Sequence, residues 1–148
     1  MTLHSPAFEP DGPIPAKFSH ARGDVAPPLT WDGVPEGTAA FALLLDDPDA
    51  PMKGSFVHWV LCGLDPERRE IAEGETPAEA TVGVNGFGER GYLGPAPPAG
   101  HGPHHYVFRL LAVDRPLQVS GVPSYREVEA AAAGHVLAEA RLVGTYEQ

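Results

Sequence analysis

The sequence predicts a mostly β protein with a sandwich-like core and one helical element near its C-terminus. Turn formers are abundant, with 17 glycines and 17 prolines among 148 residues, which disfavours a helix bundle and favours short strands joined by loops. Three apolar runs have the length of strands. One segment late in the chain combines a helix-capping pattern with helical spacing. The length indicates one domain that spans residues 1–148.

The first 28 residues carry six prolines and are expected to form extended chain and turns rather than helix. Residues 41–45 are a short apolar run that ends in acidic residues and prolines, as a buried strand would. Residues 56–62 are the second expected strand. Alternation places Phe56, His58, Val60 and Cys62 on one face and Val57, Trp59 and Leu61 on the other. Both faces are apolar, so this strand should be central in its sheet.

Residues 106–113 form the third expected strand, in which every second side chain, starting at Tyr106, shares one apolar face. Further on, Ser124 and Glu127 have the spacing of a capping box. Apolar residues then recur at helical spacing, so the sequence predicts a helix over 124–140. Gly134 lies inside this segment, where a glycine can break a helix into two pieces. Residues 142–146 are expected to close the chain as a short edge strand.

Charge and composition exclude several classes of function. Ten Lys and Arg and twenty Asp and Glu give a formal net charge of −10. Such a chain repels phosphate backbones, so neither nucleic acid nor an anionic membrane surface is an expected partner. The longest apolar run, 39–45, is too short to cross a bilayer, and the first residues show no signal peptide. The single cysteine, Cys62, excludes an internal disulfide and a thiolate metal site. These features predict a cytoplasmic protein.

The first group of candidate functional residues follows the 41–45 strand. Asp46, Asp47 and Asp49 crowd three carboxylates into a proline-containing turn, which can be no more than a rigid, capped loop. Their mutual repulsion suggests, however, that at least one carboxylate has a fixed hydrogen-bond partner. A lone histidine in a strand, such as His58, is most often a satisfied core residue. If the two strands are neighbours, His58 lies near the end of the sheet where Asp47 sits.

The second group lies in and after the irregular segment 83–103, in which seven of 21 residues are glycine and four are proline. Long irregular loops inside a compact domain are usually functional. His101, His104 and His105 have the spacing of a helical metal site, but the glycines and prolines around them forbid that helix. Extending the following strand backwards instead puts His104 and Tyr106 on one face and His105 on the other. The glycine-rich backbone, two imidazoles and a phenol would form a cradle for a phosphate-type anion.

Several functions are compatible with these residues. A metallohydrolase would bind a metal through Asp47, His58 and His104, although nothing in their spacing indicates it. A Ser-His-Asp hydrolase is disfavoured because the chain has no G-x-S-x-G elbow. A non-catalytic anion pocket needs only the donors already named, and we favour it. The enzyme alternative is a hydrolase of a small ester or phosphoester that uses Asp47 with His58 or His104 as general acid and base.

Three segments make the sequence resemble the phosphatidylethanolamine-binding protein family, which includes the Raf kinase inhibitor proteins, and in particular its short bacterial branch. They are Asp47-Pro-Asp-Ala-Pro51 followed by His58-Trp59, the loop from Gly91-Tyr92 to Gly94-Pro-Ala-Pro-Pro98-Ala-Gly100, and His104-x-Tyr106-Val-Phe108. Pro27-Pro-Leu-Thr-Trp31, Gly134-His-Val-Leu-Ala138 and Gly144-Thr-Tyr146 add support. The matches run through nearly the whole chain in the family's order.

The resemblance implies a Greek-key β-sandwich of one large and one smaller sheet, with helical structure near the C-terminus. It also implies a cavity for phosphate-type anions, or phospho-headgroups in eukaryotic members. We expect neither a cofactor nor a bound metal. The ligand-binding residues that carry over are Asp47, Asp49, His58, Trp59, Pro98, His104 and Tyr106, of which Asp49 and Trp59 are expected in support. His105 departs from the family, which usually has Arg there, and its outward position points to the outer surface or a partner contact.

The sequence therefore predicts a small soluble binding protein for a phosphate-containing or other anionic ligand. Regulation through a protein partner and a homodimer are left open, and kinase inhibition, which belongs to eukaryotic members, does not transfer. Imidazoles become protonated below a pH of about 6.5. We therefore expect a phosphomonoester to bind more strongly at mildly acid pH.

Overall fold

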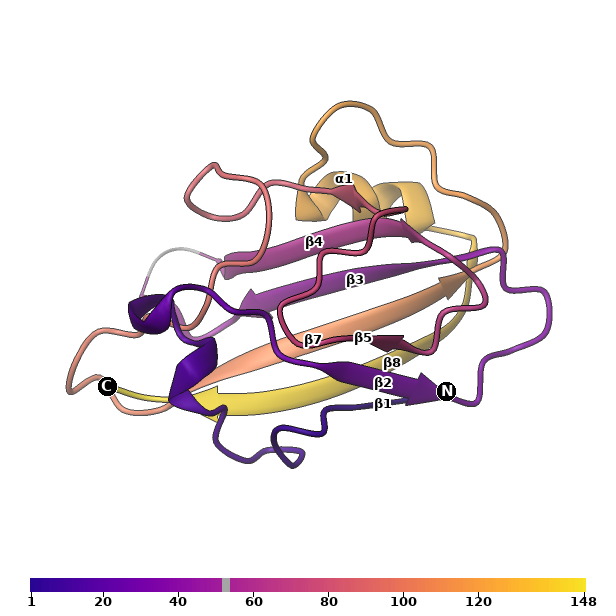
Figure 1. Cartoon of the computed structure of the whole chain (residues 1–148). Coiled ribbons are helices and arrows are strands. Elements are labelled where there is room, and N and C mark those ends of the chain that lie inside the picture. The colour runs from indigo at the N-terminus through magenta and orange to yellow at the C-terminus, as the bar shows by residue number, and fades with distance from the viewer. Residues whose placement is uncertain (52–53) are drawn as a thin grey trace.

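The computed structural model describes residues 1–51 and 54–148 as strands in two sheets, with one α-helix against the larger sheet (Figure 1). The strands are β1 (Thr2–His4), β2 (Leu29–Asp32), β3 (Ala40–Asp47), β4 (Phe56–Leu64), β5 (Glu70–Ile71), β6 (Thr81–Val82), β7 (His104–Val113) and β8 (Val136–Tyr146). The helices are α1 (Tyr125–Ala132) and two single-turn 3-10 helices, Ala16–Phe18 and His20–Arg22. The three strands predicted from apolar runs are therefore present as β3, β4 and β7.

The larger sheet has the order β6-β4-β3-β7-β8 and the smaller one the order β1-β2-β5, with antiparallel neighbours in both. In the larger sheet, β7 returns by a long connection to lie beside β3 instead of beside β6. This is the Greek-key order. The expected sandwich of one large and one smaller sheet, with a helix near the C-terminus, is confirmed.

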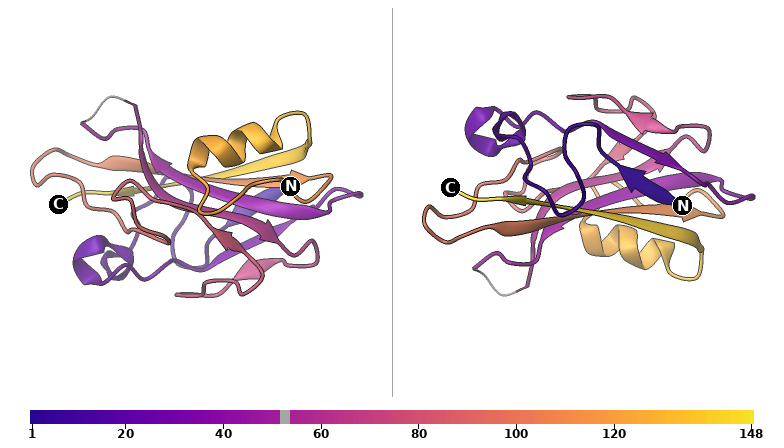
Figure 2. Two further views of the ribbon diagram at one scale, coloured as in Figure 1. Left: turned by 90° about the horizontal axis from the view of Figure 1, so that it is seen from above. Right: turned by 90° about the horizontal axis from the view of Figure 1, so that it is seen from below.

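The larger sheet is buried on both faces, as the apolar sequences of β3 and β4 require. One face packs against the smaller sheet through a core that includes Trp31, Phe41 and Phe108. The opposite face packs under α1 through a second core that includes Leu44 and Val128. Figure 2 shows the helix on one side of this sheet and the N-terminal strands on the other. β4 has neighbours on both sides, so its predicted central position is correct.

A β-bulge at His58 changes which side chains share a face along β4. Leu45 pairs with Trp59 and the next residue, Asp46, pairs with Val57, so His58 is an extra residue on β4. His58 still faces the same side as Phe56, with 5.1 Å between their ring centroids. After the bulge, however, Trp59 also faces the core between the sheets.

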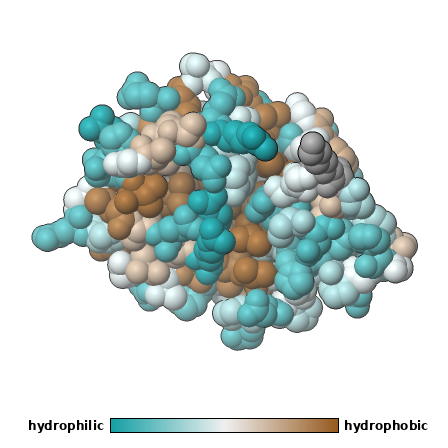
Figure 3. All heavy atoms as spheres, turned by 180° about the vertical axis from the view of Figure 1, so that it is seen from behind, coloured by the Kyte–Doolittle hydropathy of each residue, from teal (hydrophilic) through white to brown (hydrophobic). Residues whose placement is uncertain are grey.

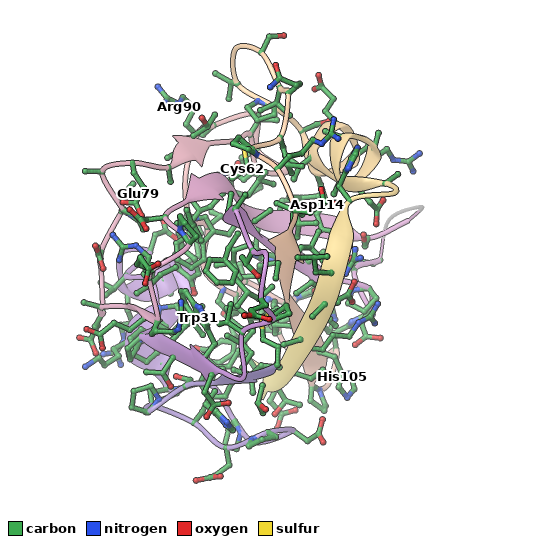
Figure 4. The ribbon with its side chains drawn as sticks, turned by 90° about the vertical axis from the view of Figure 1, so that its right-hand side faces the viewer. Trp31, Cys62, Glu79, Arg90, His105 and Asp114 are labelled. Carbon is green, nitrogen blue, oxygen red and sulfur yellow. The ribbon has the colours of Figure 1, made fainter. Side chains whose placement is uncertain are left out.

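The predicted alternation along β4 is therefore wrong beyond residue 58. Val60 and Cys62 lie under α1 and not on the side of His58. Figure 4 shows Cys62 on β4, and its thiol is buried, as expected of a core residue. The physical reason is that the extra residue of a bulge reverses the facing of the strand after it.

The C-terminal helix is shorter than predicted. Its capping box is present, with the Glu127 N–H donating to Ser124 Oγ over 3.1 Å. The helix nevertheless ends at Ala132, and Gly134 has a φ of 81°, in the left-handed region that favours glycine. β8 then starts at Val136 and pairs with β7 along its length. The prediction of helix over 124–140 is wrong after residue 132, and the edge strand is longer than the expected 142–146.

The N-terminal segment lies along the larger sheet's edge strand and continues to one end of the sandwich. The Asp11 N–H donates to the Val143 carbonyl over 2.7 Å. Further on, the Tyr92 hydroxyl donates to the Phe18 carbonyl over 2.7 Å, which ties the first 3-10 helix to the glycine-rich loop. Extended chain and turns were expected over 1–28, and two turns of 3-10 helix are present within it. This segment positions the loop that forms one wall of the cavity described below.

Large apolar side chains that reach the surface are few and scattered among the described residues: Phe87, Val122, Val136 and Leu137 are exposed. On the face opposite to that of Figure 1, apolar atoms gather in small patches separated by polar ones (Figure 3). Within residues 1–51 and 54–148, no helix has the length and hydropathy needed to span a membrane.

Candidate functional site

A cavity of about 220 Å³ lies where the C-terminal end of β3 meets the first residues of β4 and β7. This volume is several times that of one water molecule, about 30 Å³, so a tetrahedral oxyanion fits. The lining residues come from three strands and two loops: Asp47, Ala50, Pro51, Phe56, His58, Phe87, Leu93, Ala96, Pro97, Pro98, His104 and Tyr106. All five residues expected to line the pocket are among them.

Asp47, at the end of β3, has both carboxylate oxygens in hydrogen bonds. Oδ2 lies 2.6 Å from Nδ1 of His104, and Oδ1 accepts from the Asp49 N–H over 2.8 Å. Asp47 and His104 are only 3% and 2% exposed. The expected fixed partner of a carboxylate in this turn is therefore His104. A carboxylate holds the proton of the facing ring on Nδ1, so His104 has Nε2 left for other contacts.

His101 uses that remaining nitrogen. Its Nδ1 lies 2.7 Å from Nε2 of His104, and the two ring centroids are 4.9 Å apart. His101 is exposed and lies between Gly100 and Gly102, which have φ values of 77° and 84°. Sequence reasoning did not assign His101 to the site, because its contact with His104 depends on a turn that only these two glycines permit.

His58 is held by a backbone carbonyl on the opposite wall. Its Nδ1 lies 2.6 Å from the Leu93 oxygen. A carbonyl only accepts hydrogen bonds, so Nδ1 carries the proton and Nε2 has a free lone pair in the neutral ring. Among the described residues, Nε2 has no hydrogen-bond partner. Burial lowers the pKa of His58 and keeps the ring neutral near pH 7.

Tyr106 is a buried phenol on the cavity wall. It is 1% exposed, and its hydroxyl has no hydrogen-bond partner among the described residues. Its ring packs against that of His58 with 5.2 Å between centroids. Burial raises the pKa of Tyr106, so the hydroxyl stays protonated and can donate. Buried polar groups almost always have a partner, and the cavity is the space from which a ligand could supply one.

The remaining walls of the cavity are apolar. Pro98, which was expected in the lining, stands in the same loop wall as Pro97. The Phe56 and Phe87 rings meet edge to face with 5.5 Å between centroids, and Phe87 is 56% exposed. Strand alternation places Phe56 on the side of His58, so its role could have been found from sequence. No pattern in the sequence indicated Phe87.

Asp49 and Trp59, which were expected in support, lie outside the lining. Asp49 Oδ2 accepts from the His105 N–H over 2.8 Å and lies 2.7 Å from its Nδ1; these bonds lower the pKa of Asp49. Trp59 is buried and packs edge to face on Tyr92, with 5.3 Å between centroids. His105 lies on the outer side of β7 (Figure 4), as expected. Asp49 and Trp59 therefore contact elements that carry lining residues, namely β7 and the glycine-rich loop.

The lining offers groups that can bind a ligand and groups that can move a proton. No Ser, Thr or Cys nucleophile is among the lining residues in the described part of the chain. Asp47 uses both oxygens in protein hydrogen bonds, which leaves the imidazoles of His58 and His104 as the groups that could move a proton. Within the same part, no group of three or more His, Cys, Asp or Glu side chains is arranged to hold a metal ion.

Comparisons with known proteins agree with this architecture. The chain is 44% identical over 151 residues to LppC of Mycobacterium tuberculosis, whose name describes a lipoprotein, with 99% of this chain and 72% of that protein covered. It is 40% identical to a UPF0098 protein of Methanothermobacter thermautotrophicus, with 100% and 99% covered. Both relatives span nearly all of this chain, so the similarity is not confined to one motif.

Solved structures give the same picture. The phosphatidylethanolamine-binding protein homologue CT736 of Chlamydia trachomatis superposes with a TM-score of 0.93 at 35% identity, covering 99% of this chain and 97% of that one. YbcL of Escherichia coli, described as a member of the mammalian family, has a TM-score of 0.92 at 28% identity, covering 99% and 98%. The family model described as phosphatidylethanolamine-binding protein matches residues 4–147. The chain therefore belongs to the phosphatidylethanolamine-binding protein family.

Proposed function

We propose that the cavity is a non-catalytic binding site for a small phosphate-type anion or a phospho-headgroup. The single observation that carries this proposal is the hydroxyl of the cavity-lining residue Tyr106, which is buried and has no hydrogen-bond partner among the described residues. An unpaired buried hydroxyl costs about 1–3 kcal/mol, and an anion oxygen would supply the missing acceptor. His58 and His104 add imidazoles on the adjoining walls.

Tyr106→Phe tests the proposal because it removes only the hydroxyl. Since that hydroxyl is unpaired in the free protein, its removal should leave the free energy of unfolding unchanged or raise it. Binding of phosphoethanolamine, measured by titration calorimetry, should weaken about two- to tenfold. A variant that binds phosphoethanolamine as the wild type does would contradict the proposal.

Tyr125→Phe is a matched control on the other side of the larger sheet. Its hydroxyl accepts a hydrogen bond from Arg109 over 2.9 Å, so its removal should lower the free energy of unfolding and leave phosphoethanolamine binding unchanged. Two alanine variants complete the set. His58→Ala and His104→Ala should each weaken binding severely, and equal affinity in both variants and the wild type between pH 5.5 and 7.5 would remove the histidines from the site.

The Asp47–His104 pair favours one alternative, a hydrolase of a small ester or phosphoester. A carboxylate that orients an imidazole is the arrangement used in general base catalysis. A screen of generic ester and phosphoester substrates, with and without added divalent metals, separates the two functions. Turnover that is abolished in His104→Ala would support the hydrolase, whereas saturable binding without turnover supports the binding protein.

Regulation through a protein partner, self-association and a cytoplasmic location stay predictions. One relative carries a lipoprotein name, so the compartment needs a direct test. Fractionation of the native host and light scattering of the purified protein with and without phosphoethanolamine would test the location and the self-association.

A further inference from the structure

The hydrogen bond from His58 to Leu93 determines what kind of contact the cavity offers. Because Nδ1 donates to the carbonyl over 2.6 Å, the neutral ring presents only the lone pair of Nε2. An oxygen of a fully ionised anion also presents only lone pairs. Two acceptors cannot bond without a proton between them, so one proton must be present wherever an anion oxygen meets Nε2.

We propose that the cavity binds a tetrahedral oxyanion together with one proton, and therefore selects phosphate and phosphomonoesters over sulfate, sulfate esters and phosphodiesters. This inference rests on the proposed anion site and names the ligand class that it takes. In the complex, the proton lies between a ligand oxygen and Nε2 of His58. Near pH 7 the phosphomonoester is mostly a dianion, so solvent supplies this proton and binding takes it up.

Phosphomonoesters can bring or accept this proton easily because their second pKa is about 6. A sulfate ester has the same shape and size but is a strong acid, and a phosphodiester has no second ionisable oxygen. With those two ligands the proton must reside on His58 alone. The cavity would then hold a buried imidazolium, which burial disfavours.

The groups around His58 oppose one another in their effect on its charge. Asp46 and Asp47 on β3, and Asp24 in the N-terminal segment, are negative and favour the charged ring. Tyr106 on β7 packs against it as a neutral phenol. Burial outweighs the three carboxylates, and the pKa of His58 is lowered. A ligand that carries its own proton therefore avoids the unfavourable protonation of the buried His58 ring.

The same carboxylates disfavour binding of a phosphomonoester as a dianion, because like charges repel. Asp47 lines the cavity, and its two oxygens are occupied by His104 and the Asp49 N–H. The carboxylate is therefore fixed in place next to the ligand. A phosphomonoester bound as a monoanion places one negative charge less beside Asp47 than the dianion would.

Titration calorimetry with methyl phosphate, methyl sulfate and dimethyl phosphate tests the inference. At pH 7, methyl phosphate should bind about tenfold or more tightly than the other two, since an unpaired acceptor contact costs about 1–3 kcal/mol. Repeating the methyl phosphate titration in two buffers of different ionisation enthalpy should show the uptake of close to one proton. Methyl sulfate should gain affinity steadily as the pH falls from 7 to 5, because His58 then becomes charged.

His58→Gln tests the role of the imidazole in this selectivity. The glutamine amide offers both a donor and an acceptor and does not titrate between pH 5 and 7. We expect methyl phosphate and methyl sulfate to bind within about threefold of one another in this variant, with little proton uptake. His105→Gln makes the same exchange on the outer side of β7, where the ring contacts Asp49, and should keep the wild-type selectivity.

The outcomes separate the two proposals. Equal binding of methyl phosphate and methyl sulfate at pH 7 without proton uptake would overturn the selectivity and leave the anion site intact. No binding of any of the three ligands at millimolar concentration would overturn the anion site itself. If His58→Gln does not fold, the wild-type affinity ratio and proton uptake still decide the question.

Discussion

The Nδ1 atom of His101 lies 2.7 Å from Nε2 of His104, so the exposed turn at 100–102 occupies the one nitrogen that His104 has left after its bond to Asp47. An imidazole beside the cavity thus competes with an anion for His104. A ligand that reaches His104 must first replace the His101 imidazole.

Removing this competitor should strengthen anion binding. In His101→Ala the His104 nitrogen is free, and loss of one hydrogen bond of about 0.5–1.5 kcal/mol corresponds to a two- to tenfold gain in affinity. Titration calorimetry with phosphoethanolamine measures it. His105→Ala, which removes an exposed imidazole outside the cavity, should leave the affinity unchanged. Weaker binding in His101→Ala would show instead that His101 contacts the ligand directly.

Asp47 should contribute to stability through its buried bond to His104. Asp47→Asn removes the charge that holds the imidazole, and hydrogen bonds to charged groups contribute about 1.5–3 kcal/mol. We expect the free energy of unfolding in urea to fall by about 2 kcal/mol. Asp49→Asn alters an exposed pair with His105 and should change it by less than about 1 kcal/mol. Similar losses in the two variants would argue against a special role for the buried pair.

Gly94 holds the loop wall of the cavity against the N-terminal segment. Its N–H donates to Asp24 over 2.9 Å, and an added Cβ would overlap the carbonyl oxygen of Phe18. Gly94→Ala should lower the free energy of unfolding by about 1–3 kcal/mol and also weaken anion binding, because the Leu93 carbonyl that orients His58 moves with the loop. Both are measured on the same sample, by urea denaturation and calorimetry.

Gly121→Ala is the control for backbone strain alone. Gly121 has a φ of 64° with no atom within 4 Å of an added Cβ and is not a lining residue of the cavity, so only the left-handed conformation is penalised, by about 1 kcal/mol. Anion binding that weakens equally in Gly94→Ala and Gly121→Ala would contradict the role given to the Leu93–Gly94 wall.

The ion pair of Arg68 and Glu79 should make stability depend on pH. Two short bonds, of 2.7 and 3.0 Å, lower the pKa of Glu79 to about 2 from 4.5. The folded state therefore holds the carboxylate ionised more strongly than the unfolded chain does, and the gain is present above pH 4.5 and lost as the pH falls towards 2. Glu79 lies at the protein surface (Figure 4), so screening limits the gain to about 1 kcal/mol.

Urea denaturation of the wild type and Glu79→Gln between pH 7 and 3 tests this dependence. The difference in unfolding free energy should be largest near pH 6 and shrink below pH 4.5. Glu36→Gln, at an exposed position, should show no such pH dependence. A Glu79→Gln deficit that is constant with pH would mean that the carboxylate acts through packing and not through its charge.

Much of the fold follows from local patterns that survive in the tertiary structure. Residues 41–45 are apolar without interruption because β3 is covered on both faces, and a strand is the compact way to bury such a run. The bulge at His58 could not be predicted, since an extra residue leaves no mark in the composition of β4. The helix end was missed for a related reason. Residues 136–140 fit helical spacing, but pairing with β7 decides their conformation.

The candidate site also has a part that the sequence predicts and a part that it does not. Strand parity brings His104 and Tyr106 to one face, and the adjacency of two strands brings His58 near Asp47. The family resemblance adds Pro98. The contacts of His58 with the Leu93 carbonyl and of His104 with His101 were beyond prediction, because each depends on the path of an irregular loop. No periodicity governs such a path, so the partner atoms become known only from coordinates.

The bond between Asp11 and Val143 joins residues that are translated far apart in time. Gly12 and Ile14 likewise bond to Thr145, so this stretch pairs with β8, which is synthesised long after it. Neighbouring residues find their partners earlier, because β1 pairs with β2 and Phe18 accepts a hydrogen bond from Tyr92. A nascent chain therefore carries residues 11–14 without these partners until β8 has been made, and the sandwich closes along this edge late in synthesis.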